Sequence, residues 1–517
     1  MFVIDINTAF GRHSEADFDL SLNTLLASLD QHQVAGACTF SLKAAHYDPH
    51  TGNEESLAAA GCHPHLLPVA TLDLREYLGW EAEVARCLQQ GVRLFRFFPQ
   101  LQGWSVTARL FQRVLGKLHG TGVCLVFSLA EISAHDSNAM EALAMSTAER
   151  GLSVILADID YQTMAEAITV MQCYPHLYAE TNGLATVGAV EIMAEEVGAS
   201  RLLFGSAAPL RPLQKALNEV LETKLSAADK CAILGGNAMR LLNLDPSQLA
   251  GRPQLTELTP QTFNEPIIDV HSHLGHWRWP LHPERYDPTP MLKRMRQFGI
   301  AYSVLSAYEG MRYDMVAGNR HVAEAIVDHP ELLGYVAINP HQVAASCAEM
   351  DHYLQLPNFV GVELALSHTA QPTSSPEVQT LMAEIAKRHK PVLLTPASRA
   401  DAVVVRDLAR ANPTLPIILA HGIDLSWARV ISDTPNLYVE FCSSNPNNHD
   451  IRRSLALLGP ERILFGSAQT LLSVGAAIGL YWDAGLSTQE RHLILYGNAQ
   501  RLFGLTAART RSSPSFQ

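Results

Sequence analysis

The chain has 517 residues, of which 47% are hydrophobic and 17% are charged. This length is too great for one ordinary hydrophobic core, so we expect more than one domain. The net charge of -13 argues against nucleic acid and anionic membranes as partners.

Three features bear on the location of the protein. Residues 1–5 already follow a strand pattern, which leaves no room for a cleavable signal. No apolar run is long enough to cross a bilayer. The cysteines form no CxxC pair, and most of them lie in apolar patterns that suit reduced thiols. These features predict a cytoplasmic protein with no membrane partner.

Short apolar strands alternate with amphipathic stretches along the whole chain. In the first half, the expected strands span residues 2–6, 34–40, 65–71, 92–97, 122–128, 152–158, 176–181 and 201–205. In the second half, they span 266–271, 299–306, 332–338, 359–364, 391–395, 415–420, 435–441 and 461–466. One amphipathic helix is expected at about 377–387. Eight strand–helix units in each half predict an α/β fold of two tandem (β/α)8 barrels of the TIM type.

The two halves also repeat each other in sequence. Phe-Gly-Ser-Ala occurs at 204–207 and again at 465–468, and Gly-Asn-Ala follows each copy, at 236–238 and 497–499. Such self-similarity over the whole length indicates a tandem duplication. We therefore expect barrels at 1–246 and 265–508, a proline-containing linker at 247–264 and a flexible tail at 509–517.

Chemistry-bearing residues gather at the predicted strand ends of the second half. His271 and His273 lie two apart on the first strand, so both project to the same side at the barrel mouth. Two adjacent imidazoles suit a divalent metal, although hydrogen-bonded histidines without metal are the alternative. His421 ends the sixth strand and is either a ligand, an acid or base with a pKa near neutral, or a satisfied polar residue.

The order of these motifs resembles the amidohydrolase superfamily. The shared motifs are His-x-His on strand one, Gly-Val-x-Leu on strand four, His-Gly after strand six, Phe-Gly-Ser on strand eight and a closing Gly-Asn-Ala-x-Arg-Leu. The branch that it resembles most contains metal-dependent hydrolases and enzymes like aminocarboxymuconate-semialdehyde decarboxylase. In that family the strand-one histidines, a strand-five histidine and a strand-eight aspartate bind the metal, and the strand-six histidine assists catalysis or binds a second metal.

The second half departs from this pattern twice. Thr395 stands at the strand-five position, and Ala468 replaces the strand-eight aspartate. A surviving metal site would need His271, His273 and a substitute ligand. The candidates for the substitute, which lie on strand four, strand seven, strand six and a nearby loop, are Glu363, Glu440, His421 and His368. The alternative role of Glu363 is a carboxylate inside the barrel that is paired to a base.

The first half has lost more of the pattern. Asn7 and Ala9 stand where the second half has its two histidines, Asp158 replaces the strand-six histidine, and Ala207 again replaces the aspartate. We expect no metal here. Aligning Gly-Val of strand four in the two halves sets Arg93 opposite Glu363, so Arg93 is expected to point into the barrel, as a carboxylate anchor or as a salt-bridged structural arginine.

The resemblance implies a metal-assisted hydrolase of an amide, ester or lactone, or a decarboxylase, that acts on a small carboxylate. One zinc or manganese ion would bind His271 and His273 in the second barrel, and the first barrel would be structural. The expected catalytic residues are His421, Glu363 and Glu440, and the expected substrate-binding residues are Arg93, Asp158 and Thr395.

Two alternatives remain open. The first is a metal-free pseudoenzyme that binds small molecules or serves as a scaffold, which the missing aspartate favours. The second is metal-free catalysis by Glu363 or Glu440 with His421. In each case the expected partners are a small molecule, the other barrel of the same chain and, as an option, a second copy of the chain.

Overall fold

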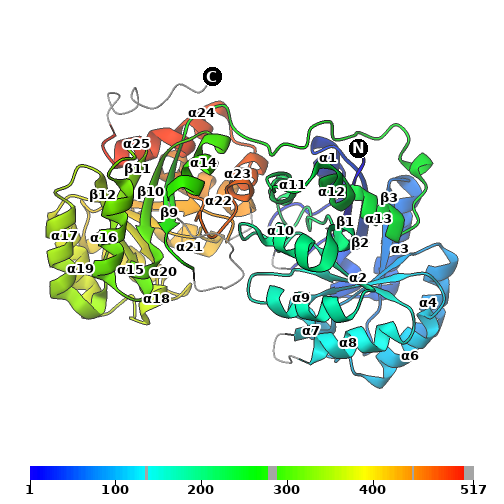
Figure 1. Ribbon diagram of the computed structural model, residues 1–517. Helices are drawn as coiled ribbons and strands as arrows, with labels where there is room; N and C mark the ends of the chain where they lie inside the picture. Colours follow the sequence, from blue (N-terminus) through cyan, green and yellow to red (C-terminus); the bar gives the residue numbers. More distant parts are fainter. Residues whose placement is uncertain (15, 134–137, 278–287, 445–447, 506–517) are drawn as a thin grey trace. The chain divides into compact units, whose positions relative to one another are not determined.

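A computed structural model of the protein describes residues 1–14, 16–133, 138–277, 288–444 and 448–505 (Figure 1). The chain divides into two compact units, Met1–Pro260 and Gln261–Gln517. The division falls inside the segment 247–264 that was expected to be the linker. The expected tail, 509–517, lies outside the described residues.

Each unit contains one eight-stranded parallel sheet, in which every strand pairs with the next along the chain. The strands of the first unit are β1 (Val3–Phe10), β2 (Val34–Ser41), β3 (Leu66–Thr71), β4 (Leu94–Phe97), β5 (Cys124–Ser128), β6 (Ser153–Ala157), β7 (Leu177–Glu180) and β8 (Leu202–Leu203). Those of the second unit are β9 (Ile267–Leu274), β10 (Ile300–Ala307), β11 (Leu332–Ala337), β12 (Phe359–Ala365), β13 (Val392–Thr395), β14 (Ile417–Leu419), β15 (Leu437–Phe441) and β16 (Ile463–Phe465). All the expected strands are present.

Helices connect the strands. In the first unit they are α1 (Leu22–Gln31), α2 (Leu42–His46), α3 (Pro49–Cys62), α4 (Trp80–Gln89), α5 (Pro99–Gln102), α6 (Arg109–Leu118), α7 (Leu129–Ser133), α8 (Ala139–Ala148), α9 (Met164–Cys173), α10 (Ala189–Met193), α11 (Leu213–Leu221), α12 (Ala227–Cys231) and α13 (Asn237–Leu241). In the second they are α14 (Pro288–Phe298), α15 (Tyr308–Arg312), α16 (Met315–Ile326), α17 (Val343–Tyr353), α18 (Leu366–Thr369), α19 (Pro376–Lys387), α20 (Ala402–Ala411), α21 (Leu425–Ile431), α22 (Asn448–Leu458), α23 (Val474–Asp483), α24 (Thr488–His492) and α25 (Asn498–Leu502). The helix expected at 377–387 is α19, whose N-terminus is capped by the Ser375 hydroxyl. No helix of the described residues is both long and apolar enough to cross a membrane.

Each sheet closes on itself. In the first unit, Ala207 N donates to Asn7 O, which joins the segment after β8 to β1. In the second unit, Ala468 N makes the equivalent bond to His271 O, after β16. The strands therefore form a ring with the helices outside it (Figure 1), and each unit is a (β/α)8 barrel, as predicted.

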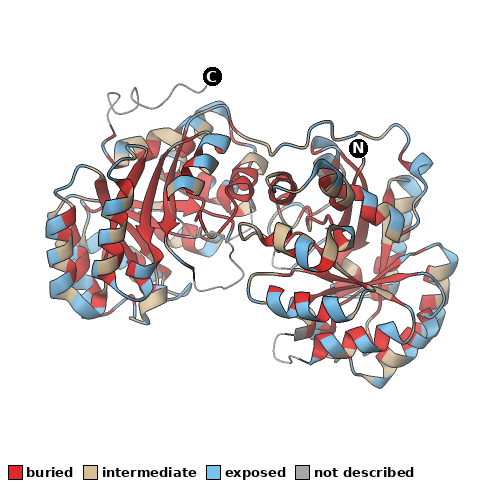
Figure 2. Cartoon of the chain, in the orientation of Figure 1, coloured by how far each residue is buried: buried red, intermediate tan, exposed pale blue. Residues whose placement is uncertain are grey.

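Strand alternation separates two layers of apolar side chains in the second barrel. Leu393 belongs to a buried cluster inside the ring, whereas its neighbours Val392 and Leu394 belong to a larger cluster that includes residues of the surrounding helices. Figure 2 shows that the strands of both units are buried, whereas the outer faces of the helices are exposed. The barrel interior is therefore packed, and polar groups collect at its mouth.

The repeated tetrapeptide has a structural role in both barrels. Ser206 Oγ donates to Asp5 Oδ2 at 2.5 Å, and Ser467 Oγ donates to Asp269 Oδ2 at the same distance. All four side chains are fully buried. These bonds join the end of the last strand to the first strand, so the serine of each copy helps to close its barrel.

The glycine of each tetrapeptide makes room for a buried glutamate of strand seven. A Cβ added at Gly205 would lie 2.3 Å from Glu180 Oε1, and one added at Gly466 would lie 2.2 Å from Glu440 Oε2. A larger residue would displace these carboxylates. The glycine and the glutamate therefore form one packing unit, which both barrels keep.

The second repeated motif, Gly-Asn-Ala, closes each barrel from its helical layer. Asn237 Nδ2 donates to Leu202 O at 2.8 Å, and Asn498 Nδ2 donates to Ile463 O at 2.9 Å. Both asparagines are fully buried at the start of α13 and α25. The motif therefore holds the closing helix on the last strand, and its presence in both halves does not require a shared active site.

Candidate active site

The polar cluster of the second barrel begins on β9. The pairing of β9 with β10 shifts its register between Asp269 and Ser272, which is a local irregularity of the strand. Asp269 Oδ1 accepts a hydrogen bond from His271 N at 3.1 Å. The side chains of His271 and His273 then lie in the mouth, and these residues are 1% and 3% exposed.

The two histidines belong to a continuous chain of contacts. His271 Nδ1 lies 2.8 Å from Glu440 Oε1, and His271 Nε2 lies 3.0 Å from His273 Nε2. His273 Nδ1 lies 3.2 Å from Ser306 Oγ. The chain thus runs from β15 across β9 to β10, and it fixes the orientation of both rings.

The charges along this chain are unequal. Burial alone would lower the pKa of His271, but the adjacent Glu440 carboxylate raises it above its usual value. Burial alone would raise the pKa of Glu440, but the His271 imidazolium lowers it. Burial and the charge on His271 both hold the pKa of His273 well below its usual value. His271 and Glu440 therefore form a buried ion pair beside a neutral His273.

Glu363 brings a second carboxylate to the same place from β12. It is 2% exposed, and its Oε2 atom has no hydrogen-bond partner among the described residues. Burial raises its pKa, while a hydrogen bond from Ser306 acts in the opposite direction. An unpartnered carboxylate oxygen at this depth is costly unless a cation or a ligand occupies the space beside it.

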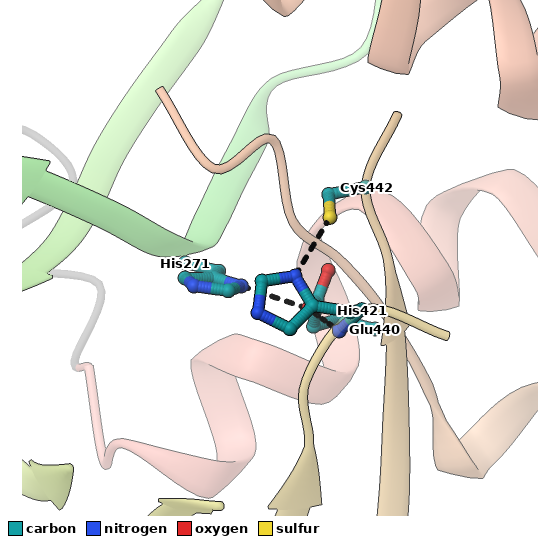
Figure 3. A group of neighbouring side chains, drawn as sticks. All are labelled: His271, His421, Glu440 and Cys442. Atoms are coloured by element: carbon teal, nitrogen blue, oxygen red, sulfur yellow. Dashed lines mark hydrogen bonds and ion pairs between the residues drawn. The ribbon is translucent and has the colours of Figure 1, made fainter. Parts of the chain in front are cut away.

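The His421 ring packs beside that of His271, with ring centroids 4.9 Å apart (Figure 3). Its backbone has a φ of 67°, and its N–H donates to Glu440 Oε1 at 2.5 Å. Its Nδ1 lies 3.3 Å from Cys442 Sγ and 3.1 Å from Ser444 Oγ. Burial and the charge on His271 lower its pKa to about 3, so His421 is neutral at physiological pH and not poised near its unperturbed value.

Among the described residues of the second barrel, two groups of side chains have the spacing of a metal site. Within each group the potential ligand atoms all lie within 4.8 Å of one another: one group is His271, His273 and Glu363, and the other is His271, His421, Glu440 and Cys442. Two nitrogens bound to one zinc or manganese ion at about 2.1 Å are roughly 3.0–3.4 Å apart, which fits the Nε2 separation of His271 and His273. The set of two imidazoles and one carboxylate therefore fits a divalent cation.

Aromatic side chains line the cluster next to His273. The Trp277 ring packs on His273 at a centroid distance of 5.2 Å and on Tyr308 at 4.2 Å. Tyr308 in turn contacts His368, whose Nδ1 lies 3.2 Å from Arg312 Nη1. His368 therefore lies in this aromatic layer and does not belong to either metal-like group.

Three residues of the cluster were missed by the sequence analysis: Cys442, Ser306 and Ser444. Cys442 follows Glu440 by two positions, so the period of a strand places both near the mouth. It belongs to a small buried cluster with Leu472 and Ala468, and Ala468 stands where the resemblance predicts an aspartate. Ser306 pairs with His273 in the ladder between β9 and β10. Thr395 is the last residue of β13, opposite Ala365.

The mouth of the first barrel holds a different set of residues. A cavity of about 140 Å³ is lined by Asn7, Ala9, Phe40, Arg96, Asp158, Ala207, Leu210 and Arg211. The expectation that Arg93 points into the barrel is wrong: Arg93 is exposed, and it donates to the carbonyls of Leu242 and Asn243 after α13.

The sheet register explains this error. Arg96 pairs with Val126 on the fifth strand of the first barrel, and Glu363 pairs with Leu393 on the fifth strand of the second. Val126 and Leu393 are equivalent, because each lies two residues before the strand end, at Ser128 and Thr395. Arg96 is thus the counterpart of Glu363. The alignment by Gly-Val had placed Arg93 there, three residues too early in the chain.

Comparisons with known proteins agree with this architecture. The family model described as amidohydrolase (Amidohydro_2) matches residues 42–244 and 268–505, once in each barrel. The chain therefore belongs to this amidohydrolase family, as a tandem duplication. No curated protein matches the chain.

Solved structures resemble one barrel at a time. A 2,6-dihydroxybenzoate decarboxylase from Rhizobium is 16% identical, with a TM-score of 0.41, and the match covers 47% of this chain and 99% of that one. A dihydroxybenzoic acid decarboxylase from Polaromonas, with bound manganese and 2-nitroresorcinol, is also 16% identical, with a TM-score of 0.41. That match covers 47% of this chain and 98% of the decarboxylase. A putative 2-pyrone-4,6-dicarboxylic acid hydrolase from Pseudomonas putida is 22% identical, with a TM-score of 0.37, and the match covers 46% of this chain and 97% of the hydrolase.

Proposed function

We propose that the second barrel is a metal-assisted hydrolase or decarboxylase of a small carboxylate substrate. The observation that carries the proposal is the convergence of His271 and His273, whose Nε2 atoms are 3.0 Å apart, with the buried Glu363 carboxylate, one oxygen of which has no partner among the described residues. Membership of the amidohydrolase family supports the same class of chemistry.

The donor set is His271, His273 and Glu363. Glu440 holds His271 through Nδ1 and leaves Nε2 directed at the site, which is the usual carboxylate support of a metal-binding imidazole. Ser306 holds His273 in the same way. A divalent cation bound to this set would polarise an oxygen of the substrate.

The other residues of the mouth act on the substrate. His421 is neutral, so one of its ring nitrogens has a lone pair that can accept a hydrogen bond from water or substrate and orient it, and its backbone N–H is held by Glu440. Thr395 offers a hydroxyl at the end of β13 that can bind a substrate oxygen. The aromatic layer of Trp277 and Tyr308 keeps water away from His273.

A sulfur-containing set with Cys442 is the competing metal site. Glu440 Oε1 is already shared by His271 Nδ1 and His421 N, and Glu440 Oε2, which like Glu363 Oε2 has no partner among the described residues, lies against Gly466. Glu440 is therefore less available as a ligand than Glu363. Burial raises the pKa of the Cys442 thiol, which opposes the thiolate that a metal requires. These two facts favour the set with Glu363.

The test is metal content. Wild type, His273→Ala, Glu363→Gln and Cys442→Ser are loaded with zinc or manganese, desalted and analysed by mass spectrometry. We expect about one ion per chain in wild type and in Cys442→Ser, and at least a tenfold loss in the other two variants. Wild-type protein that keeps no metal would overturn the proposal, and a loss confined to Cys442→Ser would transfer the site to the sulfur set.

The reaction is tested on the loaded protein. A panel of small carboxylic acids, lactones and amides is incubated with wild type and His421→Asn, and release of carbon dioxide is measured beside hydrolysis. Turnover of one substrate class that falls at least 100-fold in His421→Asn supports the proposed role of this imidazole. Equal turnover by both proteins would exclude that role.

One observation favours a metal-free binding protein as the second candidate. The contacts from Ser306 through His273 and His271 to Glu440 form a complete chain in which every ring nitrogen has a partner without a metal. Under this alternative the loaded wild type holds no ion, although a small carboxylate still binds.

A further inference from the structure

The first barrel has its own polar cavity, which the proposed chemistry of the second barrel does not use. It lies where the strands end, and its polar lining comes from Asn7 on β1, Arg96 on β4, Asp158 after β6 and Arg211 after β8. The mouth of a (β/α)8 barrel is the usual place for a ligand. The question is which ligand these groups fit.

The duplication allows a direct comparison of the two mouths. Asn7 occupies the position of His271, Ala9 that of His273, and Arg96 that of Glu363. The donor set that fits a cation in the second barrel is thus replaced by two small or neutral side chains and a guanidinium. The first mouth carries a fixed positive charge where the second presents ligands to a positive ion.

The guanidinium of Arg96 is fixed in place by its neighbours, but one of its donors has no hydrogen-bond partner among the described residues. Its Nη1 donates to Asn7 Oδ1, and its Cζ lies 5.3 Å from the Phe40 ring centroid and 5.4 Å from that of Phe98. Its Nε has no hydrogen-bond partner among the described residues. The two rings pack on each other at 5.6 Å, and an arginine held against this pair, with a donor to spare, is preorganised to bind an anion.

A second unpartnered donor lies in the same cavity. Asn7 is 3% exposed, and no described residue accepts a bond from its Nδ2, although its Oδ1 is bonded to Arg96. A buried amide hydrogen without a partner is costly, and an acceptor in the cavity would remove that cost. Asn7 Nδ2 and Arg96 Nε therefore both lack an acceptor among the described residues.

The net charge of the cavity also favours an anion. Arg211 Nη1 is paired with Asp158 Oδ1 at 3.0 Å, so these two charges balance. Glu180 lies behind them, and burial together with the Asp158 charge raises its pKa to about 8, which leaves it uncharged at neutral pH. Asp158 also acts on the charge of Arg96, so two guanidinium groups share one carboxylate in the lining, and one positive charge is in excess.

We propose that the mouth of the first barrel binds a small carboxylate anion, with Arg96 and Asn7 as donors and Arg96 in the place of the metal. A planar carboxylate matches the fork of a guanidinium. The cavity volume of about 140 Å³ suits a small anion. This site is separate from the second-barrel chemistry and stands or falls independently of it.

The test uses the full chain with its second barrel silenced. His271→Ala/His273→Ala protein is treated with a chelator and titrated calorimetrically with acetate, succinate and inorganic phosphate. Binding is then measured after adding Arg96→Met or, as the matched control, Arg93→Met, which removes an exposed arginine of the same strand region. We expect one carboxylate to bind, at least tenfold more weakly in Arg96→Met and unchanged in Arg93→Met.

Three results would overturn the proposal: no binding of either carboxylate, binding that Arg96→Met leaves intact, or binding of phosphate alone. If Arg96→Met does not fold, Asn7→Ala takes its place, because it removes the amide donor and keeps the arginine. We expect Asn7→Ala to weaken the carboxylate at least threefold with an unchanged circular dichroism spectrum. An unchanged affinity in a folded Asn7→Ala protein would count against the site.

Discussion

At the residue scale, one position on the fourth strand gives the two barrels opposite charge. Arg96 in the first barrel and Glu363 in the second occupy equivalent places in their sheets. Both side chains reach into a mouth whose other polar groups have changed with them. The glutamate completes a set that fits a cation, and the arginine completes one that fits an anion.

The buried Glu180 predicts a pH dependence of stability in the first barrel. Asp158, Asp5 and Arg96 face it, and burial with the Asp158 charge raises its pKa from 4.5 to about 8. Between these values the folded state holds a proton that the unfolded state has lost, so stability falls as pH rises, by on the order of 1 kcal/mol per pH unit. Calorimetry at pH 6 and pH 8 should show a smaller decrease of the melting temperature in Glu180→Gln, whereas the exposed control Glu195→Gln should match wild type. An equal decrease in Glu180→Gln would contradict the assignment.

Gly466 predicts a steric effect on the metal site. A Cβ at this position would lie 2.2 Å from Glu440 Oε2, so Gly466→Ala must move the carboxylate that holds His271. We expect a loss of about 1–3 kcal/mol of stability and at least tenfold weaker metal binding. Gly116→Ala, which meets no atom within 4 Å, is the control for the added methyl. Normal zinc retention by Gly466→Ala would show that Glu440 does not support the site.

At the element scale, the first and last strands of each barrel are joined by an aspartate and a serine. The Asp5–Ser206 and Asp269–Ser467 bonds are equivalent, and each aspartate also accepts from the N–H two residues later in the chain. That residue is Asn7 in the first barrel and His271 in the second, so only the second brace holds a histidine. The same brace therefore serves stability in one barrel and both stability and geometry in the other.

This pair of braces gives a matched prediction. Ser206→Ala and Ser467→Ala should each cost about 1–3 kcal/mol, because each leaves a buried carboxylate with one donor fewer. Only Ser467→Ala should also reduce metal content. Calorimetry and metal analysis of both variants provide the comparison, and equal metal retention in the two would separate the brace from the site.

The elements were predictable because their signals are local. The apolar strands and the sequence repeat gave sixteen strands and two barrels without any knowledge of side-chain packing. The side-chain direction of Arg93 was not predictable in the same way, since a shift of three residues in the loop before β4 is enough to exchange it for Arg96. Cys442 and Ser306 become site residues only when neighbouring strands are paired.

The pKa of His421 was also beyond the sequence. An isolated imidazole titrates near neutral pH, but burial and the charge on His271 lower this one to about 3. That effect depends on a neighbour from β9, 150 positions away in sequence (421 minus 271). Charges that come together only in the folded barrel decide the state of such a group.

At the scale of the whole molecule, the chain carries one fold twice with two kinds of mouth. Both barrels keep the glycine, serine and asparagine that close the ring, and they differ in the residues that would meet a ligand. Duplication preserved the packing, whereas the mouths diverged. We therefore expect a metal ion in the second barrel only.

The most direct measurement is anomalous X-ray diffraction from crystals of the full chain loaded with zinc. We expect one anomalous peak per chain, bounded by His271 Nε2, His273 Nε2 and the Glu363 carboxylate, and none beside Arg96. A chain without any peak, or a peak in the mouth of the first barrel, would contradict this assignment.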